Sequence, residues 1–112
     1  MHLPLDSYER TLAAGVSGAA RSLIFVVEDD ADIAHLIIHN LRASGFSVQS
    51  FSSGAAVISD ALREMPALFL LDVMLPGTDG FELCRHIRQT PALSATPVIF
   101  LTAKTAEADR VK

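Results

Sequence analysis

The sequence predicts an α/β fold in which helices cover both faces of a doubly wound, parallel sheet. Apolar runs such as residues 23–27 and 67–71 alternate with segments whose apolar residues recur at helical spacing. Uninterrupted apolar runs are typical of strands buried on both faces, and strand–helix alternation implies parallel strands joined by right-handed crossovers. Carboxylates directly follow both runs. We therefore expect acidic groups at the carboxyl edge of the sheet, where open α/β folds bind ligands.

Four strands are expected, at residues 22–27, 47–51, 67–72 and 97–101. The second is short and polar, which favours an edge position, whereas the other three are apolar enough to be central. A strand order of 2-1-3-4 satisfies both conditions. It places the switch point of the sheet between the first and third strands.

Helices are expected between the strands. The first spans about 31–44, with Asp30 or Asp32 at its start and Gly45 after its end. The second follows an N-cap at Ser52 or Ser53 and stops before a proline. The third spans about 79–89, and a fourth begins near residue 105. We expect the third helix to bury Phe81, Cys84 and Ile87.

Length, composition and net charge limit the classes of protein to which this chain can belong. Its 112 residues suit one domain, and half of them are hydrophobic, which is enough for a core. A net charge of −4 without a basic cluster argues against direct nucleic-acid binding. No apolar run approaches the roughly 20 residues that span a bilayer. The single cysteine, Cys84, excludes an internal disulfide and fits a reducing cytoplasm. Residues 1–21 lack a secretory pattern, and we interpret them as a flexible leader.

Three carboxylates should meet at the switch point: Glu28, Asp29 and Asp72. Because they repel one another, at least one pKa should rise unless a cation is present. A hard divalent cation with oxygen ligands resolves the repulsion, and Mg²⁺ suits a site with few protein ligands and a phosphate.

Three segments together resemble the receiver domain of bacterial two-component response regulators: Ile24–Asp30, Leu70–Gly80 and Pro97–Lys104. The resemblance covers residues 22–112. It implies a flavodoxin-like fold and a cytoplasmic signalling module, not an enzyme, that takes part in phosphorelay signal transduction.

The resemblance also implies residue roles. Asp72 would accept a phosphoryl group from a sensor histidine kinase or a phosphotransfer protein. Glu28, Asp29 and Asp72, with the backbone carbonyl of Met74, would hold Mg²⁺. The Thr102 hydroxyl would contact the phosphoryl group and couple it to a change in conformation that switches an output.

The chain departs from the family pattern at its end, because it stops before the fifth strand and fifth helix. A lysine of that fifth strand contacts the phosphoryl group in the family. Lys104 does not match it, since it lies two residues after Thr102. We therefore expect residues 22–112 to be an incomplete receiver domain, which is either a fragment or a chain that compensates by swapping elements or by forming a homodimer through the exposed fourth strand.

Other interpretations remain open. The chain could be a degenerate receiver that acts as a protein-interaction module without phosphotransfer. A phosphatase of the haloacid dehalogenase type would need an aspartate at Met74, and a flavodoxin would need a hydroxyl-rich phosphate loop in place of the acidic residues 28–30. His35 and His39 are four residues apart on one helix, but a solvated helix face accounts for them better than a metal site does.

Overall fold

The computed structural model describes residues 22–101. Its parallel sheet consists of β1 (Leu23–Val27), β2 (Ser47–Phe51), β3 (Leu68–Asp72) and β4 (Val98–Leu101), in the order β2-β1-β3-β4. This order is the predicted one, with the polar strand at an edge. The predicted leader and the helix near residue 105 lie outside the described residues.

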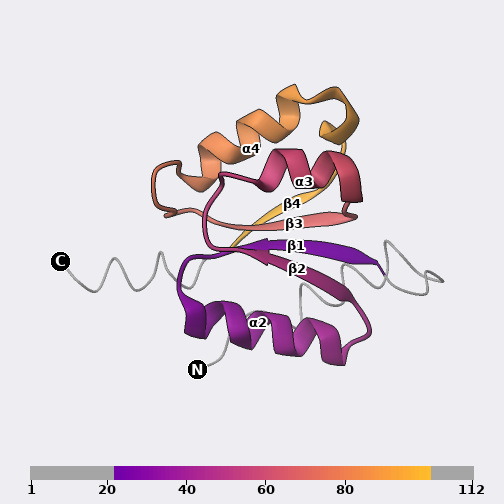
Figure 1. Ribbon diagram of the computed structural model, residues 1–112, viewed down its shortest axis with the longest axis vertical. Helices are drawn as coiled ribbons and strands as arrows, with labels where there is room; N and C mark the ends of the chain where they lie inside the picture. Colours follow the sequence, from indigo (N-terminus) through magenta and orange to yellow (C-terminus); the bar gives the residue numbers. More distant parts are fainter. Residues whose placement is uncertain (1–21, 102–112) are drawn as a thin grey trace.

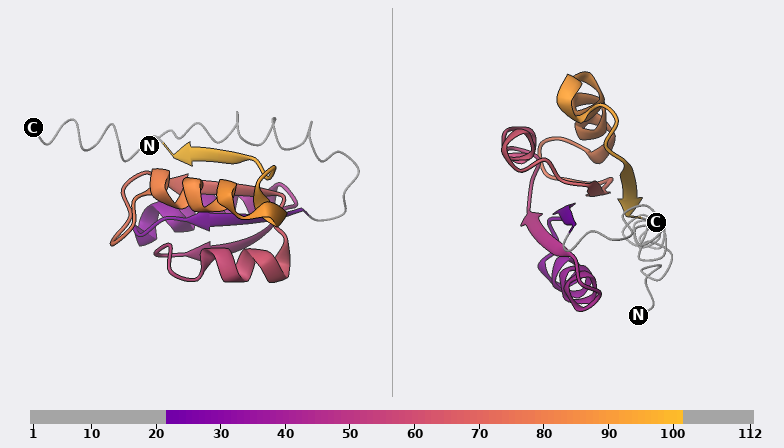
Figure 2. Two further views of the ribbon diagram at one scale, coloured as in Figure 1. Left: turned by 90° about the horizontal axis from the view of Figure 1, so that it is seen from above. Right: turned by 90° about the vertical axis from the view of Figure 1, so that its right-hand side faces the viewer.

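Helices cover both faces of the sheet. Helix α2 (Ala31–Ala43) lies on one face, and α3 (Val57–Glu64) and α4 (Gly80–Gln89) lie on the other, as Figures 1 and 2 show. A short 3₁₀ helix, η1 (Pro91–Leu93), precedes β4 and was not predicted. No helix within residues 22–101 is long and apolar enough to cross a membrane.

Each face of the sheet has its own hydrophobic core, because alternate strand residues point to opposite sides. On the α2 side, Ile37 and Leu41 of the helix pack on strand residues Ile24, Val26, Leu68, Leu70 and Leu101. On the other side, the core consists of Phe25, Val27, Val57, Ala61, Phe69, Leu71, Leu75, Leu83, Ile87 and Leu93. The central strands β1 and β3 are thus buried on both faces, as their apolar runs predict.

The ends of α2 follow from its sequence. The Asp30 carboxylate accepts hydrogen bonds from the backbone N–H groups of Asp32 and Ile33, at 3.0 and 3.1 Å, and so caps the helix as predicted. Gly45 follows the helix with a φ of +99°, a left-handed conformation that favours glycine. These two residues fix the connection from β1 to β2.

The predicted N-cap of the second helix is wrong. Helix α3 begins at Val57, and its N-cap, Ala56, makes no side-chain hydrogen bond. The Ser53 hydroxyl instead accepts a hydrogen bond from the Ala55 N–H within the preceding turn. Serine favours such local turns as much as helix caps, so the sequence pattern did not separate the two roles.

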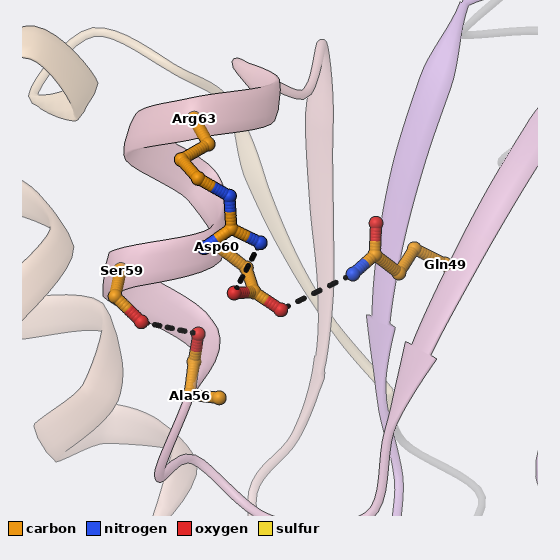
Figure 3. Close-up of polar contacts among 5 residues, drawn as sticks. All are labelled: Gln49, Ala56, Ser59, Asp60 and Arg63. Carbon is orange, nitrogen blue, oxygen red and sulfur yellow. Dashed lines mark hydrogen bonds and ion pairs between the residues drawn. The ribbon is translucent and has the colours of Figure 1, made fainter.

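A polar contact joins α3 to the edge strand β2. The Gln49 side chain donates a hydrogen bond to Asp60 at 3.2 Å, and the Arg63 guanidinium lies 2.8 Å from the same carboxylate (Figure 3). Gln49, a polar residue of the edge strand, thus has a specific hydrogen-bond partner on α3, Asp60.

The buried face of α4 differs from the prediction at one position. Ile87 is buried as expected and Cys84 is half-buried, but Phe81 is 56% exposed. Leu83 takes the core position instead, because it shares a helical face with Ile87. The Phe81 ring packs against Phe100 of β4, with ring centroids 4.8 Å apart.

Candidate functional site

The carboxyl ends of β1 and β3 bring three carboxylates together. The last register pair between these strands is Val27 with Leu71, so the residues that follow, Glu28 and Asp72, lie beside each other at the sheet edge. One carboxylate oxygen each from Glu28, Asp29 and Asp72 lies within 4.8 Å of the others. The predicted meeting of these residues at the switch point is therefore present.

The three carboxylates differ in burial. Asp72 is 0% exposed and Glu28 is 3% exposed, whereas Asp29 is exposed. The site is thus open to solvent on the Asp29 side and closed around Asp72. Burial weakens the hydration of a carboxylate and strengthens its repulsion from nearby carboxylates, so this arrangement favours a bound cation.

Backbone hydrogen bonds orient two of the carboxylates. The Asp30 N–H donates to Oε2 of Glu28 at 2.9 Å, and the Met74 N–H donates to Oδ1 of Asp72 at 3.3 Å. The Glu28 N–H also donates to the carbonyl of Phe51, which anchors the end of β1 to β2. These hydrogen bonds therefore hold the Glu28 and Asp72 side chains and the backbone at the end of β1 in place.

The donor set fits Mg²⁺. All three clustered ligand atoms are carboxylate oxygens, which hard divalent cations prefer, and the cluster contains no sulfur or imidazole ligand. Met74 follows Asp72 by two residues in the same turn and is 52% exposed. Asp30, which caps α2, is not a member of the cluster.

The predicted Thr102 and the neighbouring Lys104 lie outside the described residues. The last described residue of β4, Leu101, pairs with Asp72 in the sheet register. The described part of β4 thus ends level with the proposed phosphoacceptor.

The first residue of α4, Gly80, lies close to Asp72, and the sequence pattern did not single it out. The Gly80 N–H donates to the carbonyl of Val73 at 2.7 Å, and Gly80 is buried against the end of β3. Its neighbour Asp79 caps α4 by accepting a hydrogen bond from the Glu82 N–H at 2.8 Å. A glycine directly after the cap of a helix was the available signal.

A cavity of about 180 Å³ lies beside the acidic cluster. Glu28 and Asp29 line it, and so does His35 of α2. Both His35 and His39 are exposed, which agrees with the predicted solvated helix face, and neither belongs to the group of clustered ligands within residues 22–101. The remaining lining residues are Ala31, Ala34, Ile38, Ser50, Phe51 and Ser52.

Comparison with solved structures agrees with this geometry. The receiver domain of a sensor histidine kinase from Pseudomonas aeruginosa PAO1, which has a magnesium ion coordinated in its active-site cleft, is 31% identical with a TM-score of 0.72. The match covers 83% of this chain and 76% of that one. A response regulator from Chloroflexus aurantiacus is 30% identical with a TM-score of 0.69, over 71% of this chain and 66% of that one.

Sequence comparisons give the same result. The transcriptional regulatory protein GltR of Pseudomonas aeruginosa is 45% identical over 96 residues, and CreB of Escherichia coli K12 is 41% identical over 92 residues. These matches cover 86% and 81% of this chain, but the chain spans only 39% of the length of either relative. The profile of the response regulator receiver domain matches residues 24–112. With this match over most of its length, the chain belongs to the response regulator receiver family.

Proposed function

We propose that Asp72 of this receiver domain accepts a phosphoryl group, in the presence of Mg²⁺, from a sensor histidine kinase or a phosphotransfer protein. One observation carries the proposal: oxygens of Glu28, Asp29 and Asp72 lie within 4.8 Å of one another at the carboxyl edge of the sheet. The position of Asp72 at the end of a strand that is buried along its whole length supports its role as the acceptor.

The proposed transfer is a single displacement at phosphorus. An Asp72 carboxylate oxygen forms a bond to the phosphorus atom of a phosphohistidine, and the bond from phosphorus to the imidazole nitrogen breaks. The electron pair of that bond remains on the nitrogen, which then takes a proton. The product is an acyl phosphate on Asp72, a covalent species of the kind that aspartyl-phosphate enzymes form.

Mg²⁺ would be held by Glu28, Asp29, Asp72 and the backbone carbonyl of Met74. When bound, it supplies positive charge that offsets both the carboxylates and the oxygens of the phosphoryl group. The protein's own contribution is to orient the acceptor. The hydrogen bond from the Met74 N–H to Oδ1 of Asp72 restricts rotation of that carboxylate.

The proposal extends to the output and the cellular context. We propose that Thr102 contacts the phosphoryl group and couples phosphorylation to a conformational switch in the cytoplasm. The similar GltR and CreB are transcriptional regulatory proteins, which supports a role in gene regulation for the switch. The homodimer through β4 stays a prediction, and light scattering on a size-exclusion column tests it.

The proposed function is tested with acetyl phosphate as a small-molecule phosphoryl donor. The chain is incubated with acetyl phosphate and Mg²⁺, and its intact mass is measured with and without EDTA. We expect one phosphoryl group per chain, dependent on Mg²⁺ and absent in Asp72→Asn.

Asp30→Asn is the matched control, because it removes a neighbouring charge that caps a helix and lies outside the cluster. This variant should be phosphorylated as the wild type is. A folded wild-type chain that gains no phosphoryl group would instead favour an interaction module without phosphotransfer.

A further inference from the structure

The loop from β3 to α4 is closed by two backbone hydrogen bonds next to the acidic cluster. The Met74 N–H donates to Oδ1 of Asp72, and the Gly80 N–H donates to the carbonyl of Val73. Residues 73–79 therefore leave the sheet and return to within hydrogen-bond distance of their own starting point. The loop carries Met74, whose carbonyl is the proposed backbone ligand.

Gly80 has no room for a side chain. A Cβ atom built on it would lie 2.3 Å from the carbonyl oxygen of Asp72 and 3.0 Å from both the carbonyl carbon of Asp72 and the Cα of Val73. All three are backbone atoms of the strand end, so no rotation of a flexible side chain relieves the overlap. The φ of Gly80 is not in the left-handed region, so the requirement for glycine comes from this close approach alone.

We infer that Gly80 is a positioning residue for the phosphorylation site. Because it lacks a Cβ, the first turn of α4 lies directly against the backbone of Asp72. That contact fixes the Asp72 carboxylate and the Met74 carbonyl relative to Glu28 and Asp29. The inference rests on the proposed function, since it assigns Gly80 to the same metal and phosphoryl site.

A larger residue at position 80 must move one of two elements. Either the backbone of Asp72 and Val73 shifts, or the first turn of α4 withdraws and the 2.7 Å bond from Gly80 to Val73 is lost. Both changes alter the loop that holds Met74. Positioning groups behind metal ligands typically change metal affinity by about 10- to 100-fold when they are altered.

The test compares Gly80→Ala with two controls. Gly54→Ala makes the same substitution where a Cβ would meet only side-chain atoms of Leu83, at 3.6 and 3.7 Å, which are ordinary contact distances. Ile87→Val removes one methylene from the buried face of α4 and so reports a loss of helix packing away from the loop. Circular dichroism establishes that each variant is folded.

Two readouts follow, and neither depends on phosphorylation. Calorimetry should give a Mg²⁺ affinity at least about tenfold weaker for Gly80→Ala, and within about twofold of wild type for both controls. Amide NMR spectra of the metal-free proteins should show displaced signals for Asp72, Val73 and Met74 in Gly80→Ala alone. Unchanged signals at these residues together with wild-type affinity would overturn the inference.

The two proposals fail separately. A wild-type chain that binds no Mg²⁺ contradicts the proposed function, whereas the metal-free amide signals still decide whether Gly80 positions Asp72.

If Gly80→Ala does not fold, measurements of hydrogen exchange in the wild-type protein replace those on the variant. Mg²⁺ with beryllofluoride should slow exchange of the Gly80 N–H more than that of the Leu83 N–H, which donates to the carbonyl of the helix cap Asp79. Equal slowing would contradict the inference.

Discussion

Replacing Asp72 with asparagine should stabilise the metal-free protein. The substitution removes one of three clustered negative charges and preserves the size of the side chain. Asparagine also retains the Oδ1 atom that accepts the Met74 hydrogen bond. The structural cost is therefore small, and the relief of charge repulsion should dominate.

The magnitude follows from the spacing of the carboxylates. Two unit charges at the 4.8 Å limit of the cluster repel by about 3.5 kcal/mol at an effective dielectric constant of about 20. Asp29 is exposed and therefore well screened, and the Glu28 carboxylate already accepts a backbone hydrogen bond. After this discount, we expect the free energy of unfolding in EDTA to rise by about 1–3 kcal/mol, with Tm rising by about 4–8 °C for each kcal/mol.

Urea unfolding monitored by circular dichroism, with and without Mg²⁺, measures this effect. Mg²⁺ at ten times its Kd should add about 1.4 kcal/mol to the wild type and markedly less to Asp72→Asn. Asp30→Asn serves as the control, because its charge lies outside the cluster. The reasoning is refuted if Asp72→Asn is no more stable than wild type in EDTA, or if Mg²⁺ stabilises both proteins equally.

Three further substitutions test the surrounding structure. Asp30→Ala removes the α2 cap and should lower the free energy of unfolding by about 1 kcal/mol in urea titrations. Calorimetry should give an unchanged Mg²⁺ affinity for this variant, and a large loss of affinity would make Asp30 a ligand. Ile87→Val should cost about 0.5–1.5 kcal/mol in the same titrations, because the side chain is 0% exposed, and a neutral result would contradict its core position. Arg63→Ala should change stability by less than about 0.5 kcal/mol, since solvent screens its 64% exposed side chain; a larger thermal shift would give the contact with Asp60 more weight than we assign.

Much of the site could be predicted because it depends on the sheet. The apolar runs before Glu28 and Asp72 specify central parallel strands, and neighbouring parallel strands end at the same edge. Once the order β2-β1-β3-β4 is fixed by the polar edge strand, the three carboxylates must meet. Their differences in burial depend on surrounding packing, which the local pattern does not contain.

The features that could not be predicted depend on contacts between different secondary-structure elements, which a local sequence pattern does not show. The Phe81 ring packs on Phe100 of β4 although the residue is exposed, and the periodicity of α4 does not reveal this partner. The role of Gly80 depends on the backbone of Asp72, which lies eight positions earlier in the sequence. From helix propensity alone, Gly80 is only a residue that weakens a helix, and its close approach to the Asp72 backbone cannot be predicted.

The central claim is that Asp72 is the phosphoacceptor, and chemical trapping tests it most directly. The chain is treated with acetyl phosphate and Mg²⁺, reduced with borohydride to convert an acyl phosphate into a stable alcohol, and mapped by peptide mass spectrometry. We predict that reduction occurs at Asp72 alone and disappears when EDTA replaces Mg²⁺. Modification at another carboxylate, or at no residue of a folded chain that binds Mg²⁺, would contradict the account.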